Sequence, residues 1–272
     1  MDLVYEFELE AKRRHLSQQT IRTYGLCIQK FLKWCQKDSK SITKKDITLF
    51  MDTLVHKERA GSTLNVYVNA LRFLFVEVLS QRMTSTLVYA KTPQTLPTVL
   101  SKEEVKRLLA AIQNPKQRLM LELLYSAGLR VSELTCLKKT DLDFEQCLGW
   151  VRRGKGGKDR IFILADKLNH ALKRYLLLYP SESSYLFPGR YGRYSTRSLH
   201  EIVKRAAKKA GIQKNVHCHT LRHSFATHLV ENGYDIASIQ SLLGHSSSKT
   251  TMIYIHMASP KLVNVRSPFD DL

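Results

Sequence analysis

The sequence predicts a mainly α-helical protein with one small β-sheet. Apolar residues recur at three- and four-residue steps through most of the chain, which is the period of an amphipathic helix. Only the stretches 147–153 and 160–164 are rich in strand-forming residues. Hydrophobic residues make up 43% and charged residues 25%, which excludes wholesale disorder. A length of 272 residues suits one large domain or two ordinary ones.

The first ninety residues predict a small helical bundle. An amphipathic helix is expected after Ser17, whose hydroxyl suits an N-cap, and Thr43 is expected to cap a shorter helix. Gly61 and Ser62 open a third long helix whose apolar positions continue to Val78. We therefore expect a helical domain over residues 1–85.

A linker is expected next. Residues 81–101 contain two prolines and five threonines and have no helical period. We place the linker at 86–97, a second domain at 98–258 and a C-terminal tail at 259–272.

The second domain begins with strong helix signals. Ser101 and Glu104 form a capping-box pattern, and Pro115 opens a helix that Gly128 ends. The stretches 147–153 and 160–164 flank the basic, glycine-rich sequence GKGGKD and predict a β-hairpin. Further helices are expected at about 166–179, 196–210, 220–232, 235–243 and 248–257.

The charge is strongly positive and unevenly distributed. The formal net charge is +19. Residues 1–90 supply +5, from 14 Lys and Arg against 9 Asp and Glu, and residues 91–272 supply +14, from 29 Lys and Arg against 15 Asp and Glu. Such an excess favours a polyanionic partner, nucleic acid before an anionic membrane surface. We expect DNA contacts from Lys12, Arg13, Arg14, Lys44, Lys45, Lys158 and Arg160. An ordinary solvated face would explain the cations of the first domain equally well.

Neither a membrane nor an oxidising compartment is indicated. No apolar run approaches the ~20 residues of a membrane span, and the first residues mix acids with apolar groups, unlike a signal peptide. Five cysteines, an odd number without a C-x-x-C pair, favour reduced thiols. We expect a cytoplasmic, nucleoid-associated protein. His219 and His223 have a zinc-like spacing, but no further ligand set accompanies them, so we expect no metal.

Five motifs follow one another in the second domain. They are Gly128–Leu134 (GLRVSEL), Gly154–Gly156 (GKG), His219–His223 (HTLRH), Leu243–His245 (LGH) and Tyr254. Their order resembles that of the tyrosine recombinase (phage integrase) family, most closely its short Xer-type members. The ending VRSPFDDL is similar to the tails of mobile-element recombinases.

The resemblance implies a SAM-like core-binding domain followed by a catalytic domain. It also implies a site-specific recombinase that cuts and rejoins DNA through a 3′-phosphotyrosyl intermediate, without ATP, metal or any other cofactor. The expected partners are double-stranded DNA with inverted-repeat sites and three further copies of the chain, forming a homotetramer. The resemblance implies that the tail docks on a neighbouring protomer, and docking on its own domain is the alternative. The implied catalytic residues are Arg130, Lys155, His219, Arg222, His245 and the nucleophile Tyr254.

Elementary chemistry agrees with these roles. The arginine fork matches two phosphate oxygens, so Arg130 and Arg222 suit a phosphate clamp. A lysine at a hairpin tip, Lys155, suits a general acid for the leaving 5′ oxygen. His219 could take the tyrosine proton, and His245 could hydrogen-bond the phosphate. Glu133, about one helical turn after Arg130, could hold an arginine or histidine in place.

Two other classes of function account for part of the sequence. A DNA-binding architectural or regulatory protein on the same fold would show the same charge and domains, but it would not need the complete catalytic set. An RNA-binding protein would be expected to carry aromatic-rich motifs for single strands, which we do not find. Taken singly, each residue also has an ordinary explanation as a surface or packing group.

Overall fold

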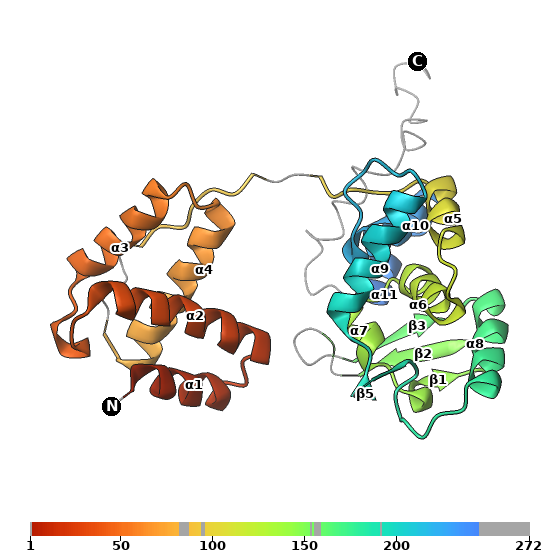
Figure 1. The fold of residues 1–272 in the computed structure, drawn as a ribbon, viewed down its shortest axis with the longest axis horizontal. Helices are drawn as coiled ribbons and strands as arrows, with labels where there is room; N and C mark the ends of the chain where they lie inside the picture. Colours follow the sequence, from red (N-terminus) through yellow and green to blue (C-terminus); the bar gives the residue numbers. More distant parts are fainter. Residues whose placement is uncertain are drawn as a thin grey trace, which may run out of the picture. The chain divides into compact units, whose positions relative to one another are not determined.

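The computed structural model describes residues 2–81, 87–93, 96–152, 154, 159–190 and 192–244. The chain forms two compact units, Met1–Gln94 and Thr95–Leu272, each with its own hydrophobic core (Figure 1). The predicted fold class, mainly helical with a small sheet, is confirmed. Within the described part of the chain, no helix is long and apolar enough to cross a membrane.

All regular elements in the described part of unit 1 are helical. The predicted caps are present, since the side chain of Ser17 accepts from Thr20 N and that of Thr43 accepts from Asp46 N. Its elements are α1 (Leu3–Arg13), α2 (Gln18–Cys35), the 3₁₀ turn η1 (Ser39–Ser41), α3 (Lys44–His56), α4 (Gly61–Arg72) and the π-helical segment η2 (Phe73–Val78).

Aromatic rings fill the core of unit 1. The ring of Phe31 lies 5.2 Å from that of Phe50 and 5.9 Å from that of Phe75, both edge to face. Phe7 packs edge to face on Phe73. Burying such large side chains is the main source of stability for a small bundle of amphipathic helices.

The third predicted helix is not one continuous α-helix. It changes to a π-helical turn at Phe73, and the amide of Leu79 donates to the carbonyl of Leu74. Leu74 and Phe75, which are adjacent in sequence, are both fully buried in this wider turn. The sequence period did not reveal the change because the apolar positions suit either helix type.

Part of the expected linker belongs to unit 1. Leu87 is buried in the core, and its carbonyl accepts from Arg72 Nη2 at 2.7 Å. The side chain of Asn65 both donates to the carbonyl of Ala90 and accepts from its amide, at 3.0 and 2.8 Å. Residues 87–90 are therefore fixed on α4.

Unit 2 surrounds a central helix. Helix α6 buries five residues, among them Leu119, Met120 and Leu124, and contacts α5, α7, α8, α9 and α10. Its contacts with five helices place it within the core of the unit, and Arg118 remains on its exposed face. The helices are α5 (Lys102–Ala110), α6 (Pro115–Ser126), α7 (Val131–Cys136), α8 (Asp166–Leu178), α9 (Thr196–Lys209), α10 (Cys218–Glu231) and α11 (Ile236–Leu243), with a 3₁₀ turn η3 (Lys139–Asp141).

The predicted hairpin is present within a three-stranded sheet. Strands β2 (Leu148–Val151) and β3 (Arg160–Ile163) pair antiparallel, with Gly149 opposite Phe162. The third strand of this sheet is the two-residue strand β1 (Leu142–Asp143), which pairs with β2. A separate two-stranded sheet is formed by β4 (Pro188–Gly189) and β5 (Gly192–Arg193). Strands this short have no periodic pattern, which is why the sequence did not indicate them.

The helices after the sheet agree with the prediction to within a few residues. The largest difference is at α10, which begins at Cys218 because the His217 ring caps it and accepts from Thr220 N. The helix expected at 248–257 lies outside the described residues.

Candidate active site

Three features of unit 2 meet at one place: the turn that ends α6, the start of α7 and the middle of α10. Gly128 has φ +55°, the left-handed conformation that favours glycine at the end of a helix. A Cβ there would lie 2.5 Å from Cδ1 of Phe225, so only glycine lets α10 approach this closely. The tight turn places Arg130 directly before α7.

Glu133 binds Arg130 from the first turn of α7. Its carboxylate accepts from the Arg130 amide at 2.9 Å and from Arg130 Nη1 at 2.6 Å. The Arg130 side chain keeps 18% of its surface exposed, against 5% for that of Glu133. The carboxylate therefore fixes both the backbone and the guanidinium of Arg130, which still faces solvent.

Two more arginines surround the same carboxylate. Arg160 Nη2 donates to Glu133 Oε2 at 2.8 Å, and Arg222 Nη1 lies 3.8 Å from that oxygen. Burial raises the pKa of the Glu133 carboxyl, but Arg160 and then Arg130 outweigh it and leave the pKa below its ordinary value. One ionised carboxylate among three guanidinium groups leaves an excess of positive charge.

Arg222 is the most deeply buried of these arginines, with 3% of its side chain exposed. Its Nη1 donates to the carbonyl of Gly128 at 2.6 Å, and its Nη2 donates to that of Leu243 at 2.5 Å. The guanidinium is thus held by the end of α6 and the end of α11.

His219 lies one turn before Arg222 on α10. Burial lowers the pKa of its imidazole, and the charge of Arg222 lowers it further, followed by His217 and Arg130. His223, with its ring centroid 6.2 Å from that of His219, has its pKa lowered to about 4, mainly by burial. Both rings are therefore neutral at neutral pH, and a neutral imidazole can accept a proton.

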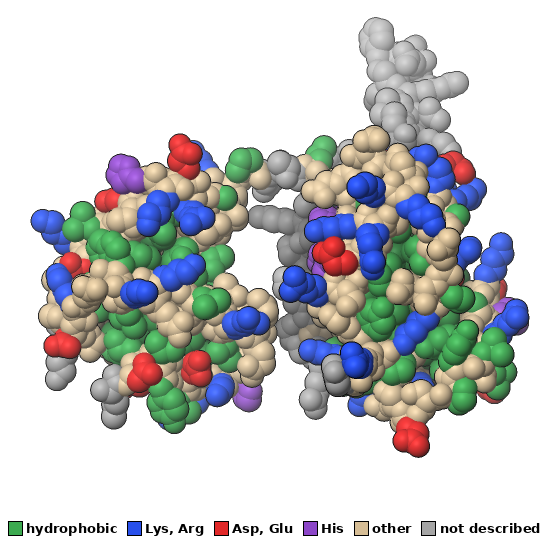
Figure 2. Space-filling model, in the orientation of Figure 1, with side chains coloured by type: hydrophobic (Ala, Val, Ile, Leu, Met, Phe, Trp, Pro, Cys, Tyr) green, Lys and Arg blue, Asp and Glu red, His purple; other side chains and the backbone are tan. Residues whose placement is uncertain are grey.

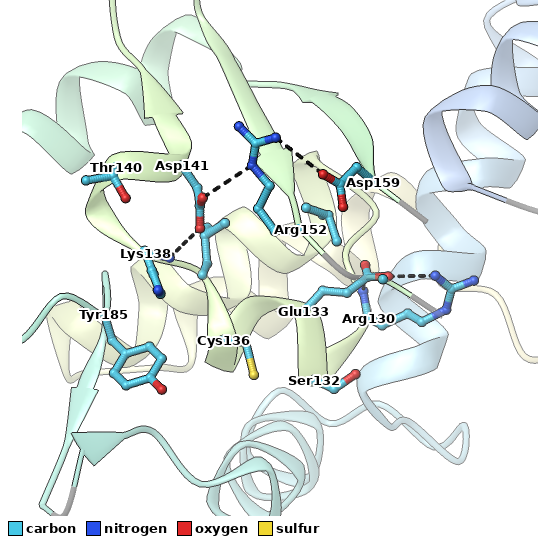
Figure 3. A pocket seen from close by; sticks show the side chains of 13 residues that line it. Arg130, Ser132, Glu133, Cys136, Lys138, Thr140, Asp141, Arg152, Asp159 and Tyr185 are labelled. Atoms are coloured by element: carbon cyan, nitrogen blue, oxygen red, sulfur yellow. Dashed lines mark hydrogen bonds and ion pairs between the residues drawn. The ribbon is translucent and has the colours of Figure 1, made fainter. Parts of the chain in front are cut away.

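A hollow of about 970 Å³ opens beside Arg130 (Figure 3). Arg152, another residue that lines it, lies between Asp159, at 3.3 Å, and Asp141, at 3.9 Å. Other side chains that line it include Ser132, Cys136, Lys138, Thr140 and Tyr185. The hollow gives a ligand access to Arg130 from solvent.

The structure brings Arg130, Glu133, His219 and Arg222 together in this way. Lys155, Lys158, His245 and Tyr254 lie outside the described residues. Among the residues that the structure does describe, no group of three His, Cys, Asp or Glu side chains is placed to hold a metal ion.

The predicted DNA contacts differ in their surroundings. Lys12, Arg13, Lys44 and Lys45 are exposed on unit 1. Arg14 is exposed too, but it pairs with Glu10 at 2.8 Å and Glu77 at 2.5 Å. Figure 2 shows Lys and Arg side chains spread over both units.

Arg160, which we expected to contact DNA, is buried in the structure. Its side chain is 7% exposed, and it pairs with Glu133 and with the carbonyl of Leu242, at 2.5 Å. Nothing in the sequence distinguishes it from the neighbouring cations. Its position at the start of β3, opposite α7 and α11, makes it an internal group.

Models of known families match both parts of the chain. Residues 98–260 match the phage integrase family, and residues 3–85 match the phage integrase N-terminal SAM-like domain. The chain belongs to the phage integrase family of tyrosine recombinases. The expectation drawn from the motif order is thus confirmed.

Xer-type recombinases are among its relatives. The chain is 39% identical to tyrosine recombinase XerA of Thermococcus kodakarensis, over 93% of this chain and 90% of that protein. It is 35% identical to tyrosine recombinase XerD of Oceanobacillus iheyensis, over 92% of this chain and 91% of that protein. These matches identify the chain as an enzyme, a site-specific DNA recombinase.

Solved structures of recombinases share the fold. A crystal structure of XerA recombinase aligns with a TM-score of 0.57 at 34% identity, over 97% of this chain and 96% of that one. XerH site-specific recombinase, bound to palindromic difH substrate in a post-cleavage complex, aligns with a TM-score of 0.73 at 27% identity, over 96% and 83%.

Proposed function

We propose that this recombinase exchanges DNA strands by two transesterifications, with Tyr254 as the nucleophile. The Tyr254 oxygen attacks the scissile phosphorus, a 3′-phosphotyrosyl bond forms, and the bond to the 5′ oxygen breaks. The 5′-hydroxyl of the partner strand then attacks the phosphotyrosyl link and releases the tyrosine. Each step exchanges one phosphoester for another, so the reaction needs no ATP.

The cluster of arginines around Glu133 is the observation that carries this proposal. A phosphodiester resists attack because its free oxygens are negatively charged, and fixed cations lower that barrier. Arg130 is oriented by Glu133 and open to the hollow, so its guanidinium can bind a phosphate oxygen. Arg222 adds a second, buried cation. With charge supplied in this way, the mechanism requires no metal.

The proton transfers are assigned to the remaining residues. His219 takes the tyrosine proton, which its lowered pKa supports because the ring is neutral and able to accept. Lys155 gives a proton to the leaving 5′ oxygen, and His245 hydrogen-bonds the phosphate. These roles of Lys155 and His245 rest on the family motifs in which they stand.

DNA recognition and assembly complete the proposal. The core-binding domain, residues 1–85, and the catalytic domain, 98–258, bind double-stranded DNA at inverted-repeat sites in the cytoplasm, at the nucleoid. Four copies assemble on two sites, and the tail, 259–272, joins neighbouring protomers. XerH, a structural relative, is known bound to palindromic DNA, which supports an inverted-repeat target.

Tyr254→Phe tests the proposal directly. The DNA target site is first found by genome-wide mapping of covalent cleavage with the purified protein. A nicked DNA substrate that traps the covalent adduct is then made from that site. The assay is run in excess EDTA. The unchanged chain should form a covalent adduct on a denaturing gel, and Tyr254→Phe should form none while binding DNA within about threefold, because only a hydroxyl is lost. Adducts that persist in Tyr254→Phe, or activity that requires added metal, would refute the mechanism.

A further inference from the structure

Arg160 is a buried arginine that the proposed mechanism does not use. It is the first residue of β3, and its guanidinium donates in two directions. Nη2 binds Glu133 Oε2 at 2.8 Å, and Nη1 binds the carbonyl of Leu242 at 2.5 Å. One side chain therefore joins the hairpin to α7 and to the last turn of α11.

Gly244 shows how closely α11 fits against this side chain. It ends α11 with φ +62°, and a Cβ there would lie 2.7 Å from Cδ of Arg160. Glycine is required here for two reasons. It adopts the left-handed conformation that ends the helix, and its lack of a side chain leaves room for the aliphatic part of Arg160.

Arg160 and Arg222 act on neighbouring groups. They donate to the consecutive carbonyls of Leu242 and Leu243, where the helix end carries partial negative charge. Both also approach the same oxygen of Glu133, at 2.8 and 3.8 Å. A displacement of Arg160 would therefore change the surroundings of Glu133, and with it Arg130, as well as the end of α11.

We propose that Arg160 is a positioning residue for DNA cleavage. Its fork fixes the Glu133 carboxylate that orients Arg130, and it fixes the last turn of α11, after which His245 follows directly in the chain. It does so without contacting DNA. This inference rests on the proposed function, because it assigns Arg160 a part in that reaction.

The two acceptors make the guanidinium irreplaceable. A planar fork reaches two acceptors in different directions, whereas a lysine ammonium is a single point charge. Arg160→Lys keeps the charge and loses the geometry. A role in charge alone, or a contact to a DNA phosphate, would survive this substitution in large part, and a positioning role would not.

The experiment compares binding with chemistry on the nicked substrate. Arg160→Lys should bind a single half-site within threefold of the unchanged chain, but its single-turnover cleavage rate at saturating protein should fall roughly 30- to 100-fold. Arg118→Lys is the matched control, because Arg118 also pairs with a glutamate, Glu122 at 2.9 Å, on the exposed surface of α6. It should cleave within about threefold.

Gly244→Ala approaches the same contact from the other side. It leaves Arg160 chemically intact and should slow cleavage through the clash with Cδ. The double variant Arg160→Lys/Gly244→Ala should be no more than about threefold slower than the slower single variant, since both act through one contact. Replacing the leaving 5′ oxygen by sulfur should rescue none of them, because the proton donor is not what they lack.

The outcomes separate the inference from the function beneath it. If the unchanged chain forms no Tyr254-dependent adduct, the proposed function fails and the inference with it. If it cleaves and Arg160→Lys cleaves equally well, only the inference fails. Loss of half-site binding by Arg160→Lys, or strictly additive defects in the double variant, would also overturn it.

Discussion

The charged network around Glu133 in unit 2 is more deeply buried than the ion pair of Asp46 in unit 1. In unit 1, Lys44 and Lys45 stand exposed, and Asp46 pairs with Lys37, a lysine whose side chain is 45% exposed. In unit 2, Glu133 pairs with Arg130 and Arg160 in a network whose side chains are 5 to 18% exposed. Water screens the exposed lysines of unit 1 and is largely excluded from the network of unit 2.

This difference implies that the two sets of charges have different functions. Exposed cations attract a polyanion over a distance and lose that attraction as salt is added. Buried, fixed cations act strongly on a single bound phosphate because little solvent reorganises around them. Variants of unit 1 should therefore alter DNA binding, and variants of the unit 2 network should alter the chemical step or the stability of that unit.

The largest effect is expected from Lys155→Ala. Losing a general acid slows a reaction by roughly 10²–10⁴-fold, so single-turnover cleavage of an ordinary phosphodiester should fall in that range. A sulfur leaving group departs without a proton, and the corresponding 5′-phosphorothiolate substrate should restore most of the rate. Equal defects on both substrates would assign Lys155 to binding, which would weaken the contrast between the units.

Glu133→Gln should strongly destabilise unit 2. It removes the carboxylate from buried arginines, and unpairing a buried charge costs about 3–5 kcal/mol. The chain has two tryptophans, Trp34 in unit 1 and Trp150 in unit 2. Urea unfolding followed by Trp150 fluorescence in a Trp34→Phe background reports on unit 2 alone.

The control for this prediction is Glu103→Gln. Glu103 also pairs with a cation, Lys106 at 2.7 Å, but both side chains are about three-quarters exposed. Its substitution should leave the urea midpoint nearly unchanged. Equal shifts for the two variants would show that burial of the Glu133 network does not matter.

Acid should unfold unit 2 before unit 1. Burial lowers the pKa of His223 from 6.5 to about 4, so between these values the unfolded chain binds a proton that the folded unit does not, and stability falls as the pH drops from about 6.5 to about 4. In unit 1 the hydrogen bond from Lys37 lowers the pKa of Asp46 from 3.8 to about 2, so its contribution is lost only between those values. Urea midpoints at pH 7.5, 5 and 3 would measure the stability of each unit, with Trp34→Phe reporting on unit 2 and Trp150→Phe on unit 1. If unit 1 lost stability at a higher pH than unit 2, the prediction would be wrong.

The smallest effect is expected from Lys44→Ala/Lys45→Ala. Each phosphate contact contributes about 0.9 to the slope of log affinity against log salt, so the slope should become shallower by about 2 if both lysines touch DNA. Cleavage at saturating protein should change less than threefold. Lys167→Ala/Lys173→Ala on α8, outside the predicted contacts, is the control and should leave the slope within about 0.5. An unchanged slope in the first variant would mean that these lysines form an ordinary solvated face.

Much of the fold was predictable because it depends on local signals. The caps at Ser17, Thr43 and Ser101 and the stop at Gly128 appear where the sequence placed them, since each satisfies helix-end groups within a few residues. The π-helical turn after Arg72 and the two-residue strands were missed. They depend on packing between distant segments and leave no periodic trace.

The candidate site divides in the same way. The sequence by itself determined which chemical groups the protein has, in which order, and the family to which they point, because motif residues such as Arg130, Glu133 and Arg222 stand in recognisable local contexts. Only the tertiary structure decided that Glu133 lies among three arginines, and that Arg160, which we expected to contact DNA, is buried between α7 and α11. The physical reason is that burial and pairing arise from contacts between residues far apart in the chain, which no local pattern encodes. Arg160 is 27 residues from Glu133 and 82 residues from Leu242.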